Sequence, residues 1–577
     1  MDEITPVNPI AANVGSAAVP LPAEQVAAPE RASRDNEQPP TEHAVEALTV
    51  SEDGTVRSKL RIYTIFLALC LTLFIGALNQ TIVATAIPSI AADLQSAEGY
   101  TWIGGAYLLA NAAAGPTIAK CSDIWGRKSV VLASVALFAV SSVIAATATS
   151  MAMLIAGRAL QGTAGGGLLQ LVSIIISDLF SMRSRALYLS AMGMVWMLAG
   201  TTGPIIGGAL SQYASWRWVF WINVPVCALA FVVILLFLDV HNPRTKLGDG
   251  LKAVDWFGTV SILAVTLLLL LGLDFGGETF PWNSPKVICL LTFGTLAIGG
   301  FFYSEKRLAK YPLMPLGIFK DLSNNAVVVV AFTHSMASSA IEYYLPLYFQ
   351  GVKQASPVES GILILPLIIT CAVVDILGGV VVHQIGRYRE LIWAGTIMLT
   401  LGTGLYVMFG TDTNLGTIIG FQIIFGIGMA LLFQTPMMAL QNSVSQANTA
   451  TATATLGFLR NLATSLSIVL GGVVFQNSMT ARAPVLAASG LSQSELAALS
   501  GYQAAANLDI TKTIDDAAQR RAVQDAFAWS IRNMFIMYTG IAAIGVVASV
   551  FIKQRHMSKE HVETKTGLEN MKEQNKT

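Results

Sequence analysis

The apolar residues of this chain are gathered into long runs, which short polar stretches separate. A helix needs about 20 apolar residues to cross a hydrocarbon core about 30 Å thick. Runs of that length predict fourteen membrane-spanning helices. They lie at about residues 62–88, 101–119, 130–149, 152–177, 186–210, 218–238, 257–273, 286–303, 325–349, 360–382, 390–409, 415–438, 456–476 and 533–552. The expected fold is therefore all-α and integral to a membrane.

Composition agrees with a chain whose partner is the lipid bilayer. Hydrophobic residues make up 54% of the 577 residues and charged residues 12%, about half the usual charged share of a soluble domain. The formal net charge of zero gives no sign of a nucleic-acid partner. The five cysteines lie in or beside apolar runs without metal-ligand spacing, so we expect neither a metal site nor a disulfide framework.

The positions of Lys and Arg predict the orientation of the chain. If the amino end is cytoplasmic, the short outer loops hold only Arg217, Lys286 and Lys353, whereas the inner loops are rich in Lys and Arg. Residues 1–58 are rich in Ala, Pro and Glu, which predicts a disordered tail. We therefore expect both termini in the cytoplasm and a long external loop at 477–532.

The chain contains an internal repeat, shown by three matches in the same order. They are the frames Asp123-x-x-Gly126-Arg127 and His383-x-x-Gly386-Arg387, the residues Gly162 and Gln170 against Gly426 and Gln434, and the pairs Gly207-Gly208 and Gly471-Gly472. The displacement is 260 residues for the first match and 264 for the others.

The repeat predicts two six-helix halves. The amino-terminal half is 59–240 and the carboxyl-terminal half is 323–553, followed by a cytoplasmic tail at 554–577. A linker at 241–322 carries the two extra helices. Paired helical halves around a midplane site are the architecture of alternating-access transporters.

Several motifs resemble the major facilitator superfamily, in its fourteen-span drug:proton antiporter branch. Residues 119–128 resemble the general loop motif of the superfamily, with Ala119 in place of a glycine. Residues 154–162 resemble the fourth-helix motif, 200–208 the fifth-helix antiporter motif and 78–88 the first-helix motif of the branch. Further segments that resemble fungal members are 215–225, 255–258, 344–350 and 474–477.

This resemblance implies a proton-coupled secondary exporter of small amphipathic organic compounds, namely drugs, toxins or fungal secondary metabolites. It further implies a monomer without cofactors in the plasma membrane, with a vacuolar or vesicle membrane as the alternative. The rival functions are import of a siderophore or other organic solute, and a receptor or scaffold, which would need a folded soluble domain. The chain has no Gly-rich phosphate loop or nucleophilic triad, so we do not expect an enzyme or an ATP-driven pump.

The resemblance also implies gating residues. They are Asp123, Gly126, Arg127, Gly386 and Arg387 in the two repeated loops, and Gly203, Pro204 and Gly207 in the fifth helix. Proline there removes a backbone hydrogen bond and is expected to kink the helix. The alternatives are that the charges only set topology and that the glycines only allow close packing.

Proton coupling presents a departure from the family. Relatives usually have aspartate where this chain has Asn79, and an amide takes up no proton. The acids left at membrane depth are Glu342, with a water-filled rim as the alternative, and Asp375, with a salt bridge to Arg387 or Arg389 as the alternative. Loss of coupling is a further alternative.

Three basic residues also lie at membrane depth. The resemblance implies that Arg158 biases a nearby carboxylate toward ionisation, with snorkelling to the outer surface as the alternative. We expect Arg460 to snorkel. His334 is left open between a polar contact and a cavity residue.

A substrate cavity is expected to have aromatic walls and a few amide groups, which suits amphipathic organic molecules. Its candidate residues are Asn79, Gln80, Gln161, Gln170, Tyr343, Tyr344, Phe433 and Gln434. The alternative for each is a polar contact between helices.

Overall fold

The computed structural model describes residues 59–577, with gaps at 84, 96–98, 242, 244, 278–279, 500–503, 505–506, 508–509, 561–565 and 575–577. The tail predicted at 1–58 lies outside the described residues. The described residues fall within one compact unit, Ala47–Thr577.

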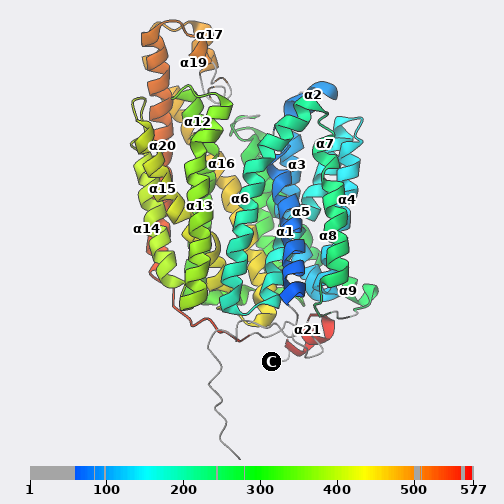
Figure 1. Ribbon diagram of the computed structural model, residues 1–577. Coiled ribbons are helices and arrows are strands. Elements are labelled where there is room, and N and C mark those ends of the chain that lie inside the picture. The colour runs from blue at the N-terminus through cyan, green and yellow to red at the C-terminus, as the bar shows by residue number, and fades with distance from the viewer. Residues whose placement is uncertain are drawn as a thin grey trace, which may run out of the picture. The chain divides into compact units, whose positions relative to one another are not determined.

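The amino-terminal half is a bundle of helices (Figure 1). Its members are α1 (Lys59–Thr81), α2 (Ile87–Asp93), α3 (Gly99–Trp125), α4 (Arg127–Ala146), α5 (Met151–Leu179), α6 (Met182–Tyr213), α7 (Trp218–Trp221) and α8 (Asn223–Phe237). Local sequence sets some of the ends. The side chain of Ser150, for example, accepts a hydrogen bond from the backbone N–H of Met153 and so begins α5.

The linker and the carboxyl-terminal half follow. The linker holds α9 (Leu247–Ala253), α10 (Trp256–Phe275), α11 (Pro285–Tyr303), the π-helical turn η1 (Ser304–Leu308) and the 3-10 turn η2 (Leu316–Lys320). The second half holds α12 (Leu322–Gly351), α13 (Pro357–Ile385), α14 (Arg389–Tyr406), α15 (Leu415–Gln441), η3 (Gln446–Asn448), α16 (Thr449–Ala488), α17 (Gln493–Ala498), α19 (Ile510–Thr513) and α20 (Ala517–Ser549), with α21 (Leu568–Gln574) near the chain end.

Twelve helices of the described chain are long and apolar enough to cross a membrane. The prediction of an all-α membrane fold is confirmed. Two helices that we expected to span, α3 and α14, are not among the twelve, although α3 packs along α5 and α14 along α15. The expected count of fourteen therefore stays a prediction.

The segment that we expected as an external loop, 477–532, is largely helical. Helix α16 continues to Ala488 and α20 begins at Ala517, well outside the apolar runs that predicted them. Buried side chains such as Leu486, Leu491 and Phe527 explain the difference, because they give these polar extensions a hydrophobic core of their own. We call α17, α19 and the adjoining ends of α16 and α20 the lobe (Figure 1).

The two ends of the bundle differ in chemistry. The lobe lies at one end, which we call the lobe end (Figure 1). Arg127 and Arg183, in the first turns of α4 and α6, and Arg387, between α13 and α14, lie at the other end, which we call the basic end. Our predicted orientation places the basic end in the cytoplasm.

The repeat is visible in the packing of the two halves. Gly126 and Gly386 both have positive φ, 89° and 73°, where the chain passes from one helix into the next. Gly207 lies against Ile82, at the end of α1, and Gly471 lies against Tyr344 of α12. Helix α6 therefore packs on α1 as α16 packs on α12.

Candidate substrate and proton sites

A buried cluster of charges lies at the basic end, where α3 passes into α4. Arg127 donates to Asp123 at 2.5 Å, to Ser122 at 2.6 Å and to Asp178 of α5 at 2.8 Å. Asp178 was not predicted as a site residue, although it ends the fourth span on the same side as Asp123. The cluster ties three helices together, so Arg127 is more than a topology-setting charge.

The second copy of this loop is built differently. Arg387 is 63% exposed and lies 3.9 Å from Glu390, while Arg389 lies 3.8 Å from the same carboxylate. A Cβ added to Gly386 would lie 2.5 Å from the guanidinium of Arg183, so the loop is in close contact with the other half.

Contacts between the halves close the basic end. Arg183 of α6 donates to the backbone oxygen of Gln384 at 3.3 Å, and the ring of His383 lies 3.2 Å from the backbone oxygen of Arg183. Arg185 donates to the side chain of Gln446 at 3.2 Å. None of these residues was predicted as a gating residue, because the sequence does not show which side chains of the two halves meet.

Helices α6 and α13 are apart at the lobe end. A Cβ added to Gly200 or Gly208 of α6, or to Gly361 of α13, would have no atom within 4 Å. This conformation is therefore closed between the halves at the basic end and open at these positions toward the lobe end.

Arg158 is 1% exposed, so it does not snorkel to a surface. It donates to the backbone oxygen of Ile103 at 3.0 Å, to the side chain of Gln161 at 2.6 Å and to the backbone oxygen of Asn79 at 3.3 Å. Its guanidinium also lies 4.4 Å from the centroid of the Tyr107 ring. All these partners are neutral, and no carboxylate of the described residues is paired with it, in contrast to the role that we expected.

Asn79 lies at the centre of this arrangement. Its side chain donates to the Oδ1 of Asn223 of α8 at 2.8 Å, and Asn223 donates back to the Oδ1 of Asn79 at 3.3 Å. Both side chains are buried. The pair joins α1 to α8 as a polar contact between helices, which was the alternative that we stated for Asn79.

The fifth-helix motif presses against the end of α1. An added Cβ at Gly203 would collide with Thr81, and one at Gly207 with the backbone oxygen of Ile82. Helix α6 continues through Pro204, which is exposed. The two glycines therefore bring α6 into backbone contact with the point at which α1 ends.

Asp375 lies between the two halves. It is 2% exposed, its Oδ1 is 3.5 Å from the hydroxyl of Ser190 of α6, and an added Cβ at Gly193 would collide with its Oδ2. That Oδ2 has no hydrogen-bond partner among the described residues. The salt bridge to Arg387 or Arg389 that we gave as an alternative is absent there, because both arginines contact Glu390 instead.

Glu342 is exposed at membrane depth and makes no ion pair with another described residue. It lies one helical turn from Ser339, whose hydroxyl donates to Thr464 of α16 at 2.9 Å. The opposite side of α12 is buried, where Tyr344 and Tyr348 lie. Glu342 thus lies on the exposed face of α12, one turn from the hydrogen bond that joins α12 to α16.

Arg460 of α16 lies one turn from the same Thr464, toward the basic end. Its Nη2 donates to the backbone oxygen of Phe433 at 2.9 Å and to that of Leu432 at 3.5 Å. The expected snorkelling is therefore wrong. Pro436 explains the longer bond, because a proline has no N–H to donate to the carbonyl four residues before it, which is that of Leu432.

The remaining cavity candidates divide into buried and partly exposed residues. Gln161 is buried and donates to Ser142 at 2.7 Å, and Tyr344 is buried and donates to the backbone oxygen of Ile468. Tyr343 is exposed. Partly exposed are Gln80, Gln170, Phe433 and Gln434.

Two of these partly exposed residues lie where the halves meet. The side chain of Gln170 fills the space beside Gly457 of α16 and Gly115 of α3, and the Phe433 ring lies near Gly193 of α6. His334 is buried, with its Nε2 3.0 Å from the backbone oxygen of Met429, so it is a polar contact and not a cavity residue.

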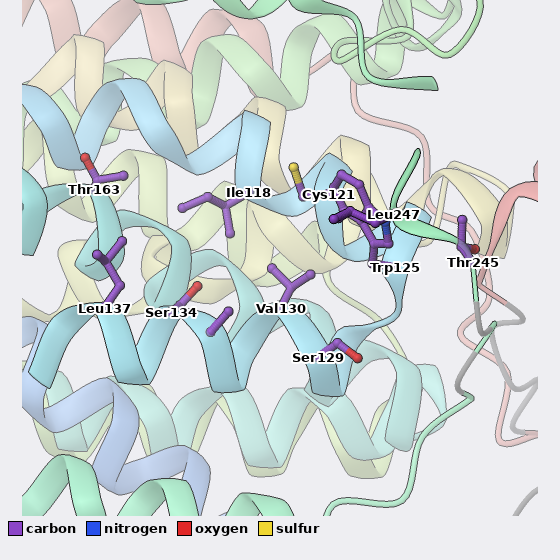
Figure 2. Close-up of a pocket in the computed structure, with 11 residues that line it drawn as sticks. Ile118, Cys121, Trp125, Ser129, Val130, Ser134, Leu137, Thr163, Thr245 and Leu247 are labelled. Carbon is purple, nitrogen blue, oxygen red and sulfur yellow. The ribbon is translucent and has the colours of Figure 1, made fainter. Parts of the chain in front are cut away.

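A separate apolar groove of about 730 Å³ runs along the flank of the amino-terminal half (Figure 2). Ile118, Cys121 and Trp125 of α3 line one side and Val130 and Leu137 of α4 the other. Its remaining lining residues are Ser129, Ala133, Ser134, Thr163, Thr245 and Leu247. None of the predicted cavity residues lines this groove, so it is not the expected substrate site.

Comparison with known proteins agrees with this architecture. Residues 69–468 match the Major Facilitator Superfamily. The chain is 43% identical over 516 residues to the MFS-type transporter ppz2 of Metarhizium majus, covering 89% of each chain. It is 41% identical to the efflux pump dotC of Dothistroma septosporum, covering 90% of this chain and 89% of that one.

A solved structure shares the fold. The proton:xylose symporter XylE superposes with a TM-score of 0.54 at 14% identity, covering 90% of this chain and all of that one. The family match, which includes most of both halves, and the two relatives establish the family. This chain is a membrane transporter that belongs to the Major Facilitator Superfamily.

Proposed function

We propose that this transporter exports small amphipathic organic compounds and is driven by a proton gradient. The direction is supported by the efflux pumps among its relatives, including dotC at 41% identity and FUS6 of Gibberella fujikuroi at 32%. The contact of Gly203 and Gly207 with the end of α1 gives the fifth-helix antiporter motif a physical role, since these helices meet backbone to backbone.

The observation that carries proton coupling is the environment of Glu342. This carboxylate is exposed at membrane depth, one turn from the hydrogen bond that joins α12 to α16, and no described cation pairs with it. Ionisable residues at membrane depth are costly and mark ion pathways. We assign Glu342 as the group that takes up and releases the proton, and Asp375 as a carboxylate that is sequestered while the basic end is closed.

Arg158 has a different role in this proposal. Its neutral partners on α1, α3 and α5 hold these helices together, so it acts by positioning them. The transporter works as a monomer in the plasma membrane, with the basic end and both termini in the cytoplasm.

Glu342→Gln tests the coupling. In inverted membrane vesicles with an imposed pH gradient, the wild type should accumulate a fluorescent amphipathic substrate. The E342Q variant should exchange labelled for unlabelled substrate, because the cavity keeps its shape, yet lose accumulation. Glu560→Gln, which changes an exposed residue after the last span, is the control. Accumulation by E342Q at the wild-type rate would exclude Glu342 as the proton carrier. If the pH gradient drives the substrate out of the inverted vesicles that contain the wild type, the protein is an importer.

A further inference from the structure

The guanidinium of Arg460 is only partly used by the protein. Its Nη2 contacts the carbonyls near Pro436, whereas its Nε is buried with no hydrogen-bond partner. Its Nη1 makes no hydrogen bond with a described residue and is not buried. No described carboxylate is within ion-pair distance. Arg460 is thus a cation at membrane depth with one accessible nitrogen and no counter-ion.

Two charges of opposite sign lie on either side of one contact between α12 and α16. The bond between Ser339 and Thr464 joins α12 to α16, Glu342 lies one turn beyond it toward the lobe end, and Arg460 lies one turn beyond it toward the basic end. Three plus four residues of helix separate them by about 10 Å. At that distance they form no ion pair, so each is available to another partner.

The surroundings of Arg460 suit an aromatic molecule. Arg460 donates to the backbone oxygen of Phe433, a residue whose ring is partly exposed and lies near Gly193 of α6. One turn away on α16, Gly457 contacts the amide of Gln170 from α5. A cation, an aromatic ring and an amide therefore converge where α5, α6, α15 and α16 meet.

We propose that Arg460 recognises the negatively charged group of the exported compound, so that the substrate class is amphipathic aromatic acids, carboxylates or phenolates. A cation at membrane depth without a counter-ion is costly, and an anionic ligand supplies the missing charge-assisted hydrogen bond. Glu342, on the lobe-end side of the Ser339–Thr464 bond, would carry the proton. This inference rests on the proposed export of amphipathic compounds and adds the charge of the substrate.

The test is a binding measurement with 1-pyrenebutyric acid and its methyl ester, which differ in charge but share the ring system. The full-length protein in nanodiscs should bind the acid more tightly than the ester at pH 7. Arg460→Gln should weaken acid binding at least about tenfold and ester binding less than about twofold, since a hydrogen bond to a charged group is worth that much. Arg460→Lys keeps the charge and should retain part of the preference.

Arg482→Gln is the matched control. Arg482 is on the same helix but lies over the Trp529 ring at 4.3 Å, in the lobe, so its loss should leave both affinities unchanged. Equal affinity of the wild type for acid and ester, equal weakening of both by R460Q, or binding of neither compound would overturn the proposal. The two proposals can fail separately. If 1-pyrenebutyric acid binds in an Arg460-dependent way but does not accumulate in inverted vesicles with an acidic interior, proton-driven export is contradicted and the assignment of Arg460 stands.

Discussion

The side-chain amides of Asn79 and Asn223 are hydrogen-bonded to each other, at 2.8 Å in one direction and 3.3 Å in the other. Each amide satisfies the other in a part of the molecule that excludes water. The backbone oxygen of Asn79 also accepts from Arg158, so the pair and the buried guanidinium form one network across α1, α5 and α8. Asn79 is thus a structural residue of this network.

Asn223→Ala should lower the free energy of unfolding by about 1–2 kcal/mol, because it removes both hydrogen bonds between the two buried amides and leaves Asn79 only its bond to the backbone oxygen of Ile75. The N79A/N223A double variant should cost less than the sum of the two single variants, since both remove the same contact. Thermal unfolding of the purified protein gives both numbers. Strict additivity would show that the two amides do not interact.

Arg127→Ala should be strongly destabilising, by about 3–5 kcal/mol, because it removes the buried cation that donates to the carboxylates of both Asp123 and Asp178. The repeat supplies the control. Arg387→Ala should cost less than about 0.5 kcal/mol, since Arg387 is 63% exposed and its contact with Glu390 is 3.9 Å long. Equal effects of the two substitutions on thermal unfolding would contradict the asymmetry of the two loops.

Arg158→Ala should abolish transport in vesicles while the protein still reaches the membrane. The change leaves three groups from α1, α3 and α5 without their donor, namely Asn79, Ile103 and Gln161. Arg158→Lys should rescue little, because an ammonium group cannot reproduce the planar set of donors. Full transport by a well-expressed R158K would mean that charge alone matters at this position.

Asp93, which lies in α2 outside the spanning helices, should give the fold a small dependence on pH. Hydrogen bonds from Trp216 at 3.0 Å and Arg217 at 2.9 Å hold the pKa of this carboxyl below its ordinary value. A lowered pKa in the folded state stabilises above the unfolded pKa, and the contribution is lost as pH falls through the folded pKa. The difference in Tm between the wild type and D93N should therefore be present at neutral pH, vanish in acid and shrink in high salt. A difference that persists in acid would exclude ionisation of Asp93 as its source.

The amino-acid sequence predicts the helices well where apolar runs cross the membrane, because length and hydropathy decide there. It fails at the ends of α16 and α20, since their extensions are held by tertiary burial of residues such as Leu486 and Phe527. The two repeated loops could be aligned from sequence, yet the sequence did not reveal that Arg127 is buried between two carboxylates whereas Arg387 is exposed.

The candidate site was harder to predict, because a motif names a residue but not its partner. Arg158 was expected beside a carboxylate and lies among neutral groups. Gln161 was expected in the cavity and instead holds that arginine. Arg460 was expected at a surface, although Pro436, visible in the sequence, leaves a carbonyl for it to bind. Such partners depend on helix rotation, which short motifs do not fix.

Gly193 of α6 contacts Asp375 of α13, and a single methyl group added to residue 193 should hold the two halves apart. A Cβ at residue 193 collides with the Oδ2 of Asp375, so the Asp375 side chain would have to shift before α6 could pack on α13 as it does here. Gly193→Ala should slow transport by about tenfold or more, because overpacking a tight contact costs about 1–3 kcal/mol in the closed conformation alone. Gly200→Ala, on the same helix but with no atom within 4 Å of the added Cβ, should transport like the wild type. The double variant G193A/D375A removes the colliding oxygen and should recover part of the closing step. The measurement is exchange of labelled for unlabelled substrate, because exchange needs closure but no net proton movement. If the double variant exchanges as slowly as G193A, the collision with Asp375 is not what limits closure.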